Sequence, residues 1–338
     1  DLVVYIPEAA VIPEWILKQY NFWNEKENKG IFAGQKGNRV KSIKLRGELS
    51  TGIILPTQIE FISKKNYIKN NLNNEVLFCD EGDDVAEFLG ITKYEPPIPV
   101  HMAGEIFNAG SHLTIHYDIE NFKSFPDILQ EGEEVVITEK LHGSWCGIII
   151  VPEKDGTSDM FNGRILVCSK GLGAQGLCFK ANEQNETNVY IRVLKHLNIF
   201  DKLLHLFNDT TVPIFVLGEV YGPGVQDLSY GNELSFRIFD IGAGYRGSQI
   251  YWDHELMTNT ANLLGIQTVP LIYKGSFSKK KMLELTSGKE TVSGKNLHMR
   301  EGIVIKPIKE RNDEKLGRVI LKSVSAEYLT RKGGTEYN

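Results

Sequence analysis

The chain has 338 residues, of which 41% are hydrophobic and 24% are charged, and its formal net charge is −5. This composition is typical of a globular protein long enough for two domains. No apolar run approaches the roughly 18 residues of a membrane span, and no secretory signal is present, which argues against a membrane or secreted protein. The negative net charge also argues against nucleic-acid binding through bulk charge, so such binding would need a local basic surface.

The first part of the chain, up to about residue 125, has short strand-like runs at 2–6, 40–45, 52–55 and 75–79, separated by Gly, Asn and Pro. This pattern predicts a small β-barrel. One helix is expected at 83–90, where apolar residues share a face and Gly90 is a stop signal. A proline-rich connector at 94–99 is expected to be a linker or a crossing over the barrel.

A basic segment lies within this first part. It places five cations within eleven residues: Lys36, Arg39, Lys41, Lys44 and Arg46. The segment is either a solvated strand face or a groove that follows nucleic-acid phosphates.

The remainder of the chain has longer strand patterns. They lie at 134–138, 145–151, 165–169, 214–220, 236–241, 302–305 and 318–323. Helical spacing of apolar residues occurs at 189–207 and more weakly at 255–264. Because strands and helices do not alternate regularly, we expect an α+β fold with mostly antiparallel sheets. The boundary near residue 125 gives two domains, 1–125 and 126–338. Cys79, Cys146, Cys168 and Cys178 are scattered without zinc-finger spacing, which predicts free thiols.

Lys140 is the first candidate for chemistry, because it ends an apolar strand and is followed by Gly143. An ordinary lysine has a pKa of about 10.4 and is mostly protonated at neutral pH, so a nucleophilic lysine needs nearby cations, desolvation or a metal ion. A lysine and a glycine at this spacing are common by chance, and an exposed strand-end lysine is the alternative.

Further segments have the order that a nucleotidyl-transfer site needs. Each combines a charged or aromatic residue with a strand end or a glycine-rich turn: Lys170, Glu219, Phe239 with Asp240, Glu301 and Lys322. Taken singly, each is as well explained by an ordinary turn, a core strand or a solvated charge.

Together these segments resemble the covalent nucleotidyltransferase superfamily, which includes ATP-dependent ligases and mRNA capping enzymes. The most informative runs are Glu139-Lys140-Leu141-His142-Gly143, Gly218-Glu219-Val220-Tyr221-Gly222, Phe236-Arg237-Ile238-Phe239-Asp240, Arg300-Glu301-Gly302-Ile303-Val304 and Leu321-Lys322-Ser323. These runs look like RNA ligases, in particular the Deinococcus-type family related to phage RNA ligase 2 and the editing ligases. Residues 45–56 are similar to that family's N-terminal OB-type domain, so the resemblance covers most of the chain.

The resemblance implies a role for each matching residue. Lys140 would become lysyl-AMP, Lys322 would contact the α-phosphate, and Glu219 and Glu301 would hold the ribose and the waters of a divalent metal. Nucleotide contacts would also come from Glu139, His142, Gly143, Arg164, Lys170, Phe239 and Asp240. Among them, Glu139 would lie beside the adenine edge, Lys170 or Arg164 near the ribose and donor phosphate, and Phe239 would stack on adenine.

Two positions depart from the wider superfamily. His142 stands where many members have Asp; the Deinococcus-type group shares this histidine, which either contacts phosphate or the nick, or packs beside Trp145. Ile320 occupies the place of a lysine found in many relatives, and Arg318 is a candidate to supply the missing charge.

The resemblance implies an ATP-dependent RNA ligase that joins 3′-OH and 5′-phosphate ends through lysyl-AMP and an adenylylated 5′ end, with Mg²⁺ or Mn²⁺. We expect RNA, or an RNA-containing duplex with a nick or break, as its substrate in RNA repair, and a cytoplasmic monomer as the enzyme. A DNA ligase or a GTP-using capping enzyme usually carries an OB domain after the last motif, whereas only sixteen residues follow Lys322 here. A non-catalytic RNA-binding protein is the alternative from another class.

Overall fold

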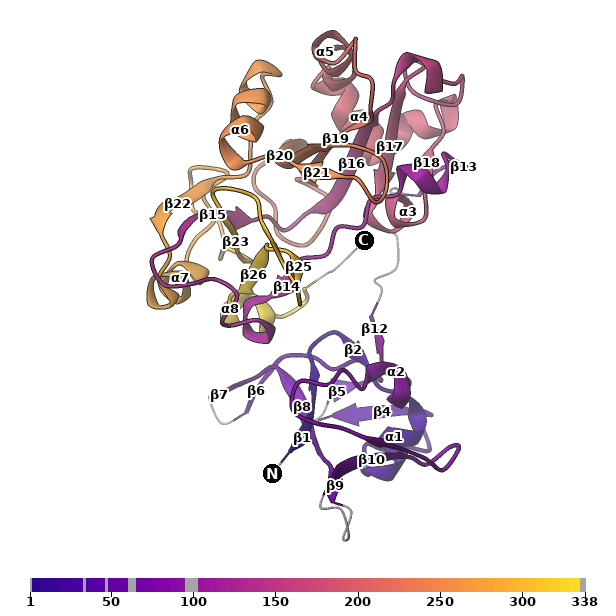
Figure 1. The fold of residues 1–338 in the computed structure, drawn as a ribbon, viewed down its shortest axis with the longest axis vertical. Coiled ribbons are helices and arrows are strands. Elements are labelled where there is room, and N and C mark those ends of the chain that lie inside the picture. The colour runs from indigo at the N-terminus through magenta and orange to yellow at the C-terminus, as the bar shows by residue number, and fades with distance from the viewer. Residues whose placement is uncertain (1, 33–34, 46–47, 60–64, 95–102, 335–338) are drawn as a thin grey trace. The chain divides into compact units, whose positions relative to one another are not determined.

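The computed structural model describes residues 2–32, 35–45, 48–59, 65–94 and 103–334. The chain separates into two compact units, Asp1–Glu95 and Pro96–Asn338. Each unit has its own core, and each is described by itself (Figure 1). Among the described residues, no helix is both long enough and apolar enough to cross a membrane.

The smaller unit is built mainly from short strands. Its elements are β1 (Val3–Pro7), β2 (Ala10–Val11), α1 (Glu14–Gln19), β3 (Trp23–Asn24), β4 (Lys29–Phe32), β5 (Gln35–Lys36), β6 (Ile43–Leu45), β7 (Glu48–Ser50), β8 (Gly52–Pro56), β9 (Gln58–Ile59), β10 (Asn66–Asn70), β11 (Glu75–Phe78), α2 (Ala86–Leu89) and β12 (Thr92–Lys93). The helix expected at 83–90 is present as α2, and Gly90 ends it in the left-handed conformation with φ 69°.

The core of this unit forms where β1 and β8 pair and α1 packs beside them. Val4 and Ile6 alternate inward along β1, and Leu17 of α1 joins the same cluster. In the described part of the unit the strands form five small sheets, and no closed barrel is found among them. The predicted OB-type barrel is therefore not confirmed. Of the earlier expectations, the connector beyond Tyr94 and the cation Arg46 lie outside the described residues.

The larger unit has longer elements. They are β13 (Ile106–Asn108), β14 (Glu120–Asn121), β15 (Glu134–Lys140), β16 (Ser144–Ile150), β17 (Ile165–Ser169), α3 (Lys170–Ala174), β18 (Leu177–Phe179), α4 (Val189–His196), α5 (Ile199–Leu206), β19 (Ile214–Tyr221), β20 (Ser235–Ala243), β21 (Ile250–Tyr251), α6 (His254–Leu263), β22 (Leu271–Ser276), α7 (Lys279–Thr286), β23 (Gly302–Pro307), β24 (Asn312–Asp313), β25 (Gly317–Arg318), β26 (Leu321–Val324) and α8 (Ala326–Leu329). Short 3-10 turns lie at Ser111–Leu113, Phe122–Ser124, Glu153–Asp155 and Glu183–Thr187.

Two five-stranded sheets form the centre of this unit. Sheet I has the order β17-β16-β19-β20-β21, and sheet II has the order β14-β26-β23-β15-β22. All their pairings are antiparallel except that of β14 with β26. Figure 1 shows α4, α5 and α6 beyond sheet I, and α7 and α8 beside sheet II. The predicted α+β class with mostly antiparallel sheets is confirmed.

Alternation along the strands explains this layering. In sheet I, Cys146, Ile148 and Ile150 face a core shared with α4, α5 and α6, while Trp145 and Ile149 face a second core that includes Ile320. In sheet II, one face packs on Phe277 and α7. The second core joins the two sheets, and the charged residues of interest lie along it.

Two sequence expectations differ from the structure. The helix expected at 189–207 is two helices, because Asn198 between α4 and α5 adopts the left-handed conformation with φ 51°. Residues 106–121 were expected in the first domain, but β13 pairs with β18 and β14 with β26, which places them on the larger unit. The sequence did not predict this placement, because the partners are far apart along the chain and strands of two or three residues are too short to show a periodic pattern.

Candidate active site

The nucleophile candidate, Lys140, is the last residue of β15, on the face of sheet II that points toward sheet I. Directly opposite residues of an antiparallel pair share a face, and Lys140 lies opposite Gly302 on β23. Val304 is two residues beyond Gly302 on β23, so its side chain is on the same face, and it packs into the core between the sheets. Lys322 lies opposite Val304. Lys322 is half-buried. The strand register therefore brings Lys140 and Lys322, which are far apart in sequence, onto one surface.

Glu219 comes to this site from sheet I. It lies opposite Trp145, and Trp145 faces the core between the sheets. The short turn between β15 and β16 carries the chain from sheet II to sheet I, which brings Lys140 and Glu219 to the same end of the two sheets. The predicted carboxylate and the predicted nucleophile are thus brought together.

Gly143 makes this approach possible. A Cβ atom at Gly143 would lie 2.3 Å from the carbonyl oxygen of Val220 and 2.8 Å from Cγ of Glu219. Such distances are well inside van der Waals contact, so a larger residue would push the turn away from β19. Gln226 Nε2 also donates a hydrogen bond to the Gly143 carbonyl at 2.6 Å.

Lys140 contacts Glu301 directly. Its Nζ lies 2.6 Å from Oε1 of Glu301, and the two side chains are 27% and 9% exposed. The lysine thus remains accessible while its carboxylate partner is nearly buried. Glu301 precedes β23, so the pairing of β15 with β23 places it beside the end of β15.

Glu219 has an unusual charge environment. Burial raises its pKa to about 8, the negative charge of Glu301 adds to the rise, and the cations Lys140 and Lys170 oppose it. Two carboxylates near one another in a partly dehydrated site favour a proton or a cation between them. Perturbed carboxylates of this kind are typical of functional sites.

His142 is buried in the turn after Lys140, with 3% of its surface exposed. Its Nε2 lies 2.7 Å from Oδ1 of Asp227, and its Nδ1 lies 2.8 Å from the Tyr328 hydroxyl. Glu301 Oε2 is 3.8 Å from Nδ1. Burial lowers the pKa of His142, although the neighbouring carboxylates oppose this effect. Its ring meets that of Tyr328 edge to face.

Glu139 points away from Lys140, as alternation along a strand requires. It is 1% exposed, and its Oε2 accepts hydrogen bonds from the backbone and hydroxyl of Thr291, at 2.9 and 2.6 Å. Its other oxygen is buried without a hydrogen-bond partner among the described residues. Burial raises the pKa of this carboxyl group.

The two candidates for a basic residue near the ribose are separated by the length of β17. Lys170 follows the strand, contacts Asp118 at 2.7 Å and lowers the pKa of Glu219 through its charge. Arg164 precedes the strand, roughly 20 Å from Lys170 at about 3.3 Å per residue, and donates to the carbonyls of Val151 and Asn208. The structure thus brings Lys170 to the site and leaves Arg164 at the opposite end of the sheet.

Phe239 and Asp240 lie at a β-bulge. Leu217 pairs with Asp240 and Gly218 with Ile238, so Phe239 is the extra residue of β20. As a result the side chains of Phe239 and Asp240 both point toward the core between the sheets, although adjacent residues of a regular strand point to opposite faces. Phe239 is half-buried, and its ring lies 5.3 Å from that of Tyr117.

Asp240 is fully buried in an ion-pair cluster that links the sheets. Lys306 Nζ lies 2.5 Å from it, and Arg318 contacts both of its oxygens at 2.9 and 3.0 Å. Tyr117 donates a hydrogen bond to it, and Glu310 also contacts both Lys306 and Arg318. These cations hold the pKa of Asp240 well below its usual range. Asp240, predicted to contact the nucleotide, thus has both of its oxygens engaged by protein groups.

Ile320 and Arg318 are also explained by this arrangement. Ile320 is 4% exposed and packs in the core between the sheets with Trp145 and Leu217. The Arg318 guanidinium lies 3.7 Å above the Tyr251 ring and contacts two carboxylates. Its charge is therefore engaged within the protein, which does not favour its use as a replacement for the lysine missing at Ile320.

Several residues around the site were not found from the sequence: Asp227, Tyr230, Thr291, Tyr328 and Arg331. They lie in loops or in α8, where no periodic pattern marks them. The sequence holds one signal that could have found Tyr328: Ser325, directly after the last motif, is a favourable N-cap residue. Its hydroxyl accepts a hydrogen bond from the Tyr328 backbone and begins the short helix α8.

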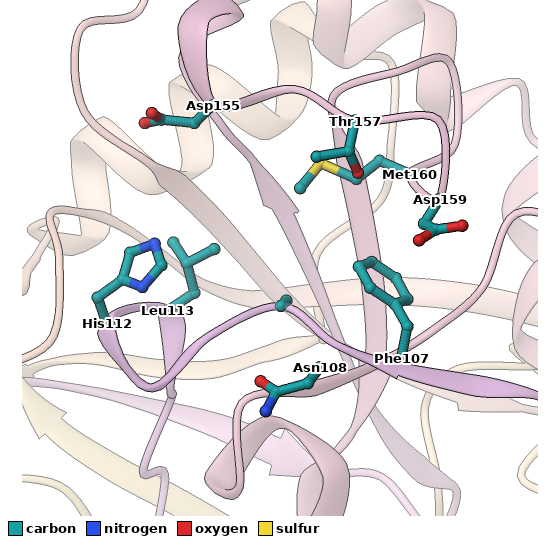
Figure 2. Close-up of a pocket in the computed structure, with 9 residues that line it drawn as sticks. Phe107, Asn108, His112, Leu113, Asp155, Thr157, Asp159 and Met160 are labelled. Atoms are coloured by element: carbon teal, nitrogen blue, oxygen red, sulfur yellow. The ribbon is translucent and has the colours of Figure 1, made fainter.

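A separate pocket of about 310 Å³ contains none of the candidate residues. It is lined by Phe107, Asn108, Ala109, His112, Leu113, Asp155, Thr157, Asp159 and Met160. Figure 2 shows these side chains coming from β13, the turn that follows it and the segment after β16. Because β16 runs from the Lys140 turn toward this segment, the pocket lies at the other end of sheet I.

Comparison with known proteins places the chain among the ligases. The family model described as RNA ligase matches residues 133–324, which contain Lys140, Glu219, Glu301 and Lys322. No curated protein sequence matches the chain.

Solved structures share its fold. Naegleria gruberi RNA ligase with PPi is 23% identical, with a TM-score of 0.69 over 97% of this chain and 85% of that chain. A lysine-to-alanine variant of the same ligase with ATP and Mn is 22% identical, with a TM-score of 0.67 over 97% of this chain and 86% of that chain. At these identities the likeness shows the fold.

Proposed function

The chain belongs to the RNA ligase family, and we propose that it joins RNA ends with ATP through a covalent AMP adduct on Lys140. One observation carries this proposal: Lys140 is an accessible strand-end lysine that contacts Glu301, beside Glu219 and on the same sheet face as Lys322. Similar folds have been solved with ATP and Mn and with AMP and Mn, which supports the same nucleotide and Mg²⁺ or Mn²⁺ for this chain.

The first step would attach AMP to the enzyme. The Lys140 amine forms a bond to the α-phosphorus of ATP while the bond to the bridging oxygen breaks, and the electron pair leaves with pyrophosphate. The amine gives up a proton, for which the Glu301 carboxylate at 2.6 Å is an acceptor. Lys322, two rows along the same face, would stabilise the charge that develops on the phosphate.

The next two steps would seal the RNA. The 5′-phosphate of one end attacks the lysyl-AMP phosphorus and takes the AMP, which frees Lys140. The 3′-OH of the other end then attacks the activated 5′-phosphorus, loses its proton and releases AMP. Each transfer requires an attacking oxygen held in line with the leaving group.

Glu219 and Glu301 could supply two of the ligands of a divalent cation. No group of three or more His, Cys, Asp and Glu side chains among the described residues is arranged as a metal site. Mg²⁺, however, commonly binds through one or two carboxylates plus waters and substrate phosphates, and the mutual effect of Glu219 and Glu301 favours a cation there. A bound metal ion would neutralise phosphate charge during transfer.

For the nucleotide, we propose that the Glu139 backbone lies beside the adenine edge, that Phe239 stacks on adenine, and that Lys170 lies near the ribose and donor phosphate. Phe239 is half-buried on the bulge, as an aromatic platform needs to be. Lys170 is exposed enough to exchange Asp118 for a phosphate, with 37% of its side chain accessible. Asp240 would support the Phe239 platform through its ion pairs.

Finer assignments also remain proposals. We propose Deinococcus-type subfamily membership on the basis of His142, and an OB-type nucleic-acid-binding role for residues 1–95 on the basis of its short strands and basic segment. Nicked or broken RNA-containing duplexes are the proposed substrate, in RNA repair. A cytoplasmic location and a monomeric state stay predictions.

Incubation with α-labelled ATP or GTP and Mn²⁺ tests the proposal. We expect protein-bound label from ATP alone, and none in Lys140→Ala. Lys140→Ala should still seal a pre-adenylylated nicked duplex in part, because the later steps do not form a new bond to the lysine. Label from GTP would indicate a capping-type enzyme, and absence of label from both nucleotides would indicate a non-catalytic protein.

Sealing assays then identify the nucleic acid. Nicked duplexes that differ only in ribose or deoxyribose on each side of the break distinguish RNA ligation from DNA ligation. Efficient sealing of an all-DNA nick would contradict an RNA substrate.

A further inference from the structure

The His142 ring is held at both of its nitrogens. Asp227 accepts at Nε2 and the Tyr328 hydroxyl lies at Nδ1, at 2.7 and 2.8 Å. The His142 backbone N–H donates to the Tyr230 hydroxyl at 2.6 Å. Because protein groups engage both ring nitrogens of a buried side chain, the ring is poorly placed to contact a phosphate. Its arrangement is that of a structural support directly after the nucleophile.

The partners of His142 hold one another. Arg331 contacts Asp227 through Nε and Nη2 at 2.9 and 3.1 Å, and its guanidinium lies 3.7 Å above the Tyr328 ring. Arg331 Nη1 also donates to the Tyr328 carbonyl at 3.0 Å. Such a closed set of charged and aromatic contacts restricts each side chain more than a single hydrogen bond would.

The same C-terminal segment fixes Glu301. The Ser325 backbone donates to the Glu301 carbonyl at 2.8 Å, and its hydroxyl donates to the Arg300 carbonyl at 3.0 Å. Ser325 also caps α8, the helix that presents Tyr328. One short segment therefore bonds to both neighbours of Lys140: Glu301 through its backbone, and His142 through Tyr328.

We propose that Asp227, Tyr328 and Arg331 are positioning residues of the adenylylation step, which hold His142 and Glu301 so that Lys140 points at the nucleotide. This inference rests on the proposed function of Lys140. It assigns His142 to support of the nucleophile, and gives Tyr328 and Arg331, which follow the Leu321-Lys322-Ser323 motif, a positioning part in the first reaction step.

Tyr328→Phe is the most selective test, because it removes one hydroxyl and keeps the ring beneath Arg331. Tyr245→Phe is a matched control: its hydroxyl also makes a side-chain hydrogen bond, to Asp155 at 2.9 Å, but Asp155 lines the separate pocket. Single-turnover labelling with ATP should slow roughly tenfold in Tyr328→Phe, the size of one lost hydrogen bond that orients a reacting group. The ATP concentration at half-maximal rate should stay unchanged, and Tyr245→Phe should label at the wild-type rate.

A double-mutant cycle shows whether Tyr328 acts through His142. Tyr328→Phe should have little further effect in a His142→Ala background. If His142→Ala does not fold, Asp227→Asn takes its place in the cycle. Equal slowing in both backgrounds would overturn the inference, as would normal labelling by Tyr328→Phe, or the same slowing in Tyr245→Phe.

The outcomes also separate this inference from the proposed function. If the wild type takes label from ATP and Tyr328→Phe matches it, the positioning role fails and the ligase proposal stands. If the wild type takes no label, the proposed function fails and the inference fails with it.

Discussion

Two charged clusters lie between the same two sheets, and they are built on opposite principles. In the reactive cluster, Glu219 and Glu301 lie beside Lys140, and the pKa of Glu219 is raised to about 8. In the clamp cluster, Asp240 is held by two cations, and its pKa is lowered well below the usual range. Lys140 of the first cluster and Lys306 of the second share one face of sheet II. Lys306 lies opposite Val136, and Val136 and Lys140 are both on β15 at alternate positions that point to the same side.

The difference shows how to separate a reactive site from a structural one in this protein. The clamp satisfies its charges internally, which fixes the distance between the sheets but leaves little for a ligand to complete. The reactive cluster has two neighbouring carboxylates and an accessible lysine, so a cation or a nucleotide would complete it. Substitutions should therefore affect catalysis at one cluster and stability at the other.

The largest expected effect comes from Lys322, which lies on the face between Lys140 and Lys306. Lys322→Ala should slow lysyl-AMP formation about 100-fold or more, because it removes the cation that we propose stabilises the transferring phosphate. Its free energy of unfolding should change by no more than about 0.5 kcal/mol. Quench-flow labelling and urea unfolding measure the two quantities.

Lys306→Ala is the matched control for this comparison, since it removes a lysine from the same strand face. It should destabilise the protein and label normally in its folded fraction. Normal labelling by Lys322→Ala would remove Lys322 from the phosphate site.

Asp240→Asn should destabilise the larger unit by about 3 kcal/mol, because it leaves the two buried cations Lys306 and Arg318 with Glu310 as their one remaining carboxylate among the described contacts. The labelling rate of the folded fraction should change little. Thermal unfolding followed by circular dichroism measures the loss. An unchanged melting temperature together with weaker ATP binding would instead make Asp240 a nucleotide ligand, as the sequence pattern predicted.

Ile320→Lys restores the lysine that many relatives carry and should cost about 2 kcal/mol, because an ammonium group would enter the apolar core between the sheets. Adenylylation should not become faster. Ile320→Leu keeps the apolar character and serves as the control. A faster first step without loss of stability would mean that this position faces the nucleotide.

The smallest expected effect is on the pH dependence of stability in metal-free protein. The folded pKa of Glu219 is raised to about 8, above its ordinary value of about 4.3. The folded state therefore binds a proton that the unfolded state lacks, so this contribution is present at low pH and is lost as pH rises toward 8.

Glu219→Gln should remove this part of the decline in the free energy of unfolding between pH 5 and 8. Urea unfolding of both proteins at several pH values, in the presence of a chelator, measures this difference. The histidines titrate in both proteins, so the comparison with the wild type isolates the contribution of Glu219. Parallel curves for the two proteins would contradict the raised pKa.

The sequence predicted much of the sheet structure of the larger unit. The strand expected at 165–169 is β17 with the same bounds, and the strands expected at 145–151 and 214–220 differ from β16 and β19 by one residue at one or both ends. These strands are buried and strongly apolar, so their pattern does not depend on distant partners. The smaller unit was less predictable: α1 was missed, and its two-residue strands leave no periodic signal.

The candidate site was predicted in part. Lys140, Glu219, Glu301 and Lys170 were identified from motif spacing, and the structure groups them by contact or by charge. Arg164 was also a candidate, but it lies at the other end of β17. The motif places both residues within a short stretch of sequence, and only the direction of the strand separates them.

The sequence by itself determined the α+β class, the main strands and the motifs that lead to the RNA ligase family, because these depend on local alternation and on the order of residues along the chain. The tertiary structure decided which charges meet. The bulge at Phe239 turned Asp240 into the core, the turn at Gly143 brought Lys140 beside Glu219, and α8 brought Tyr328 to His142. Each of these contacts joins residues distant in sequence, and its energy depends on burial and geometry that appear only when the two sheets pack together.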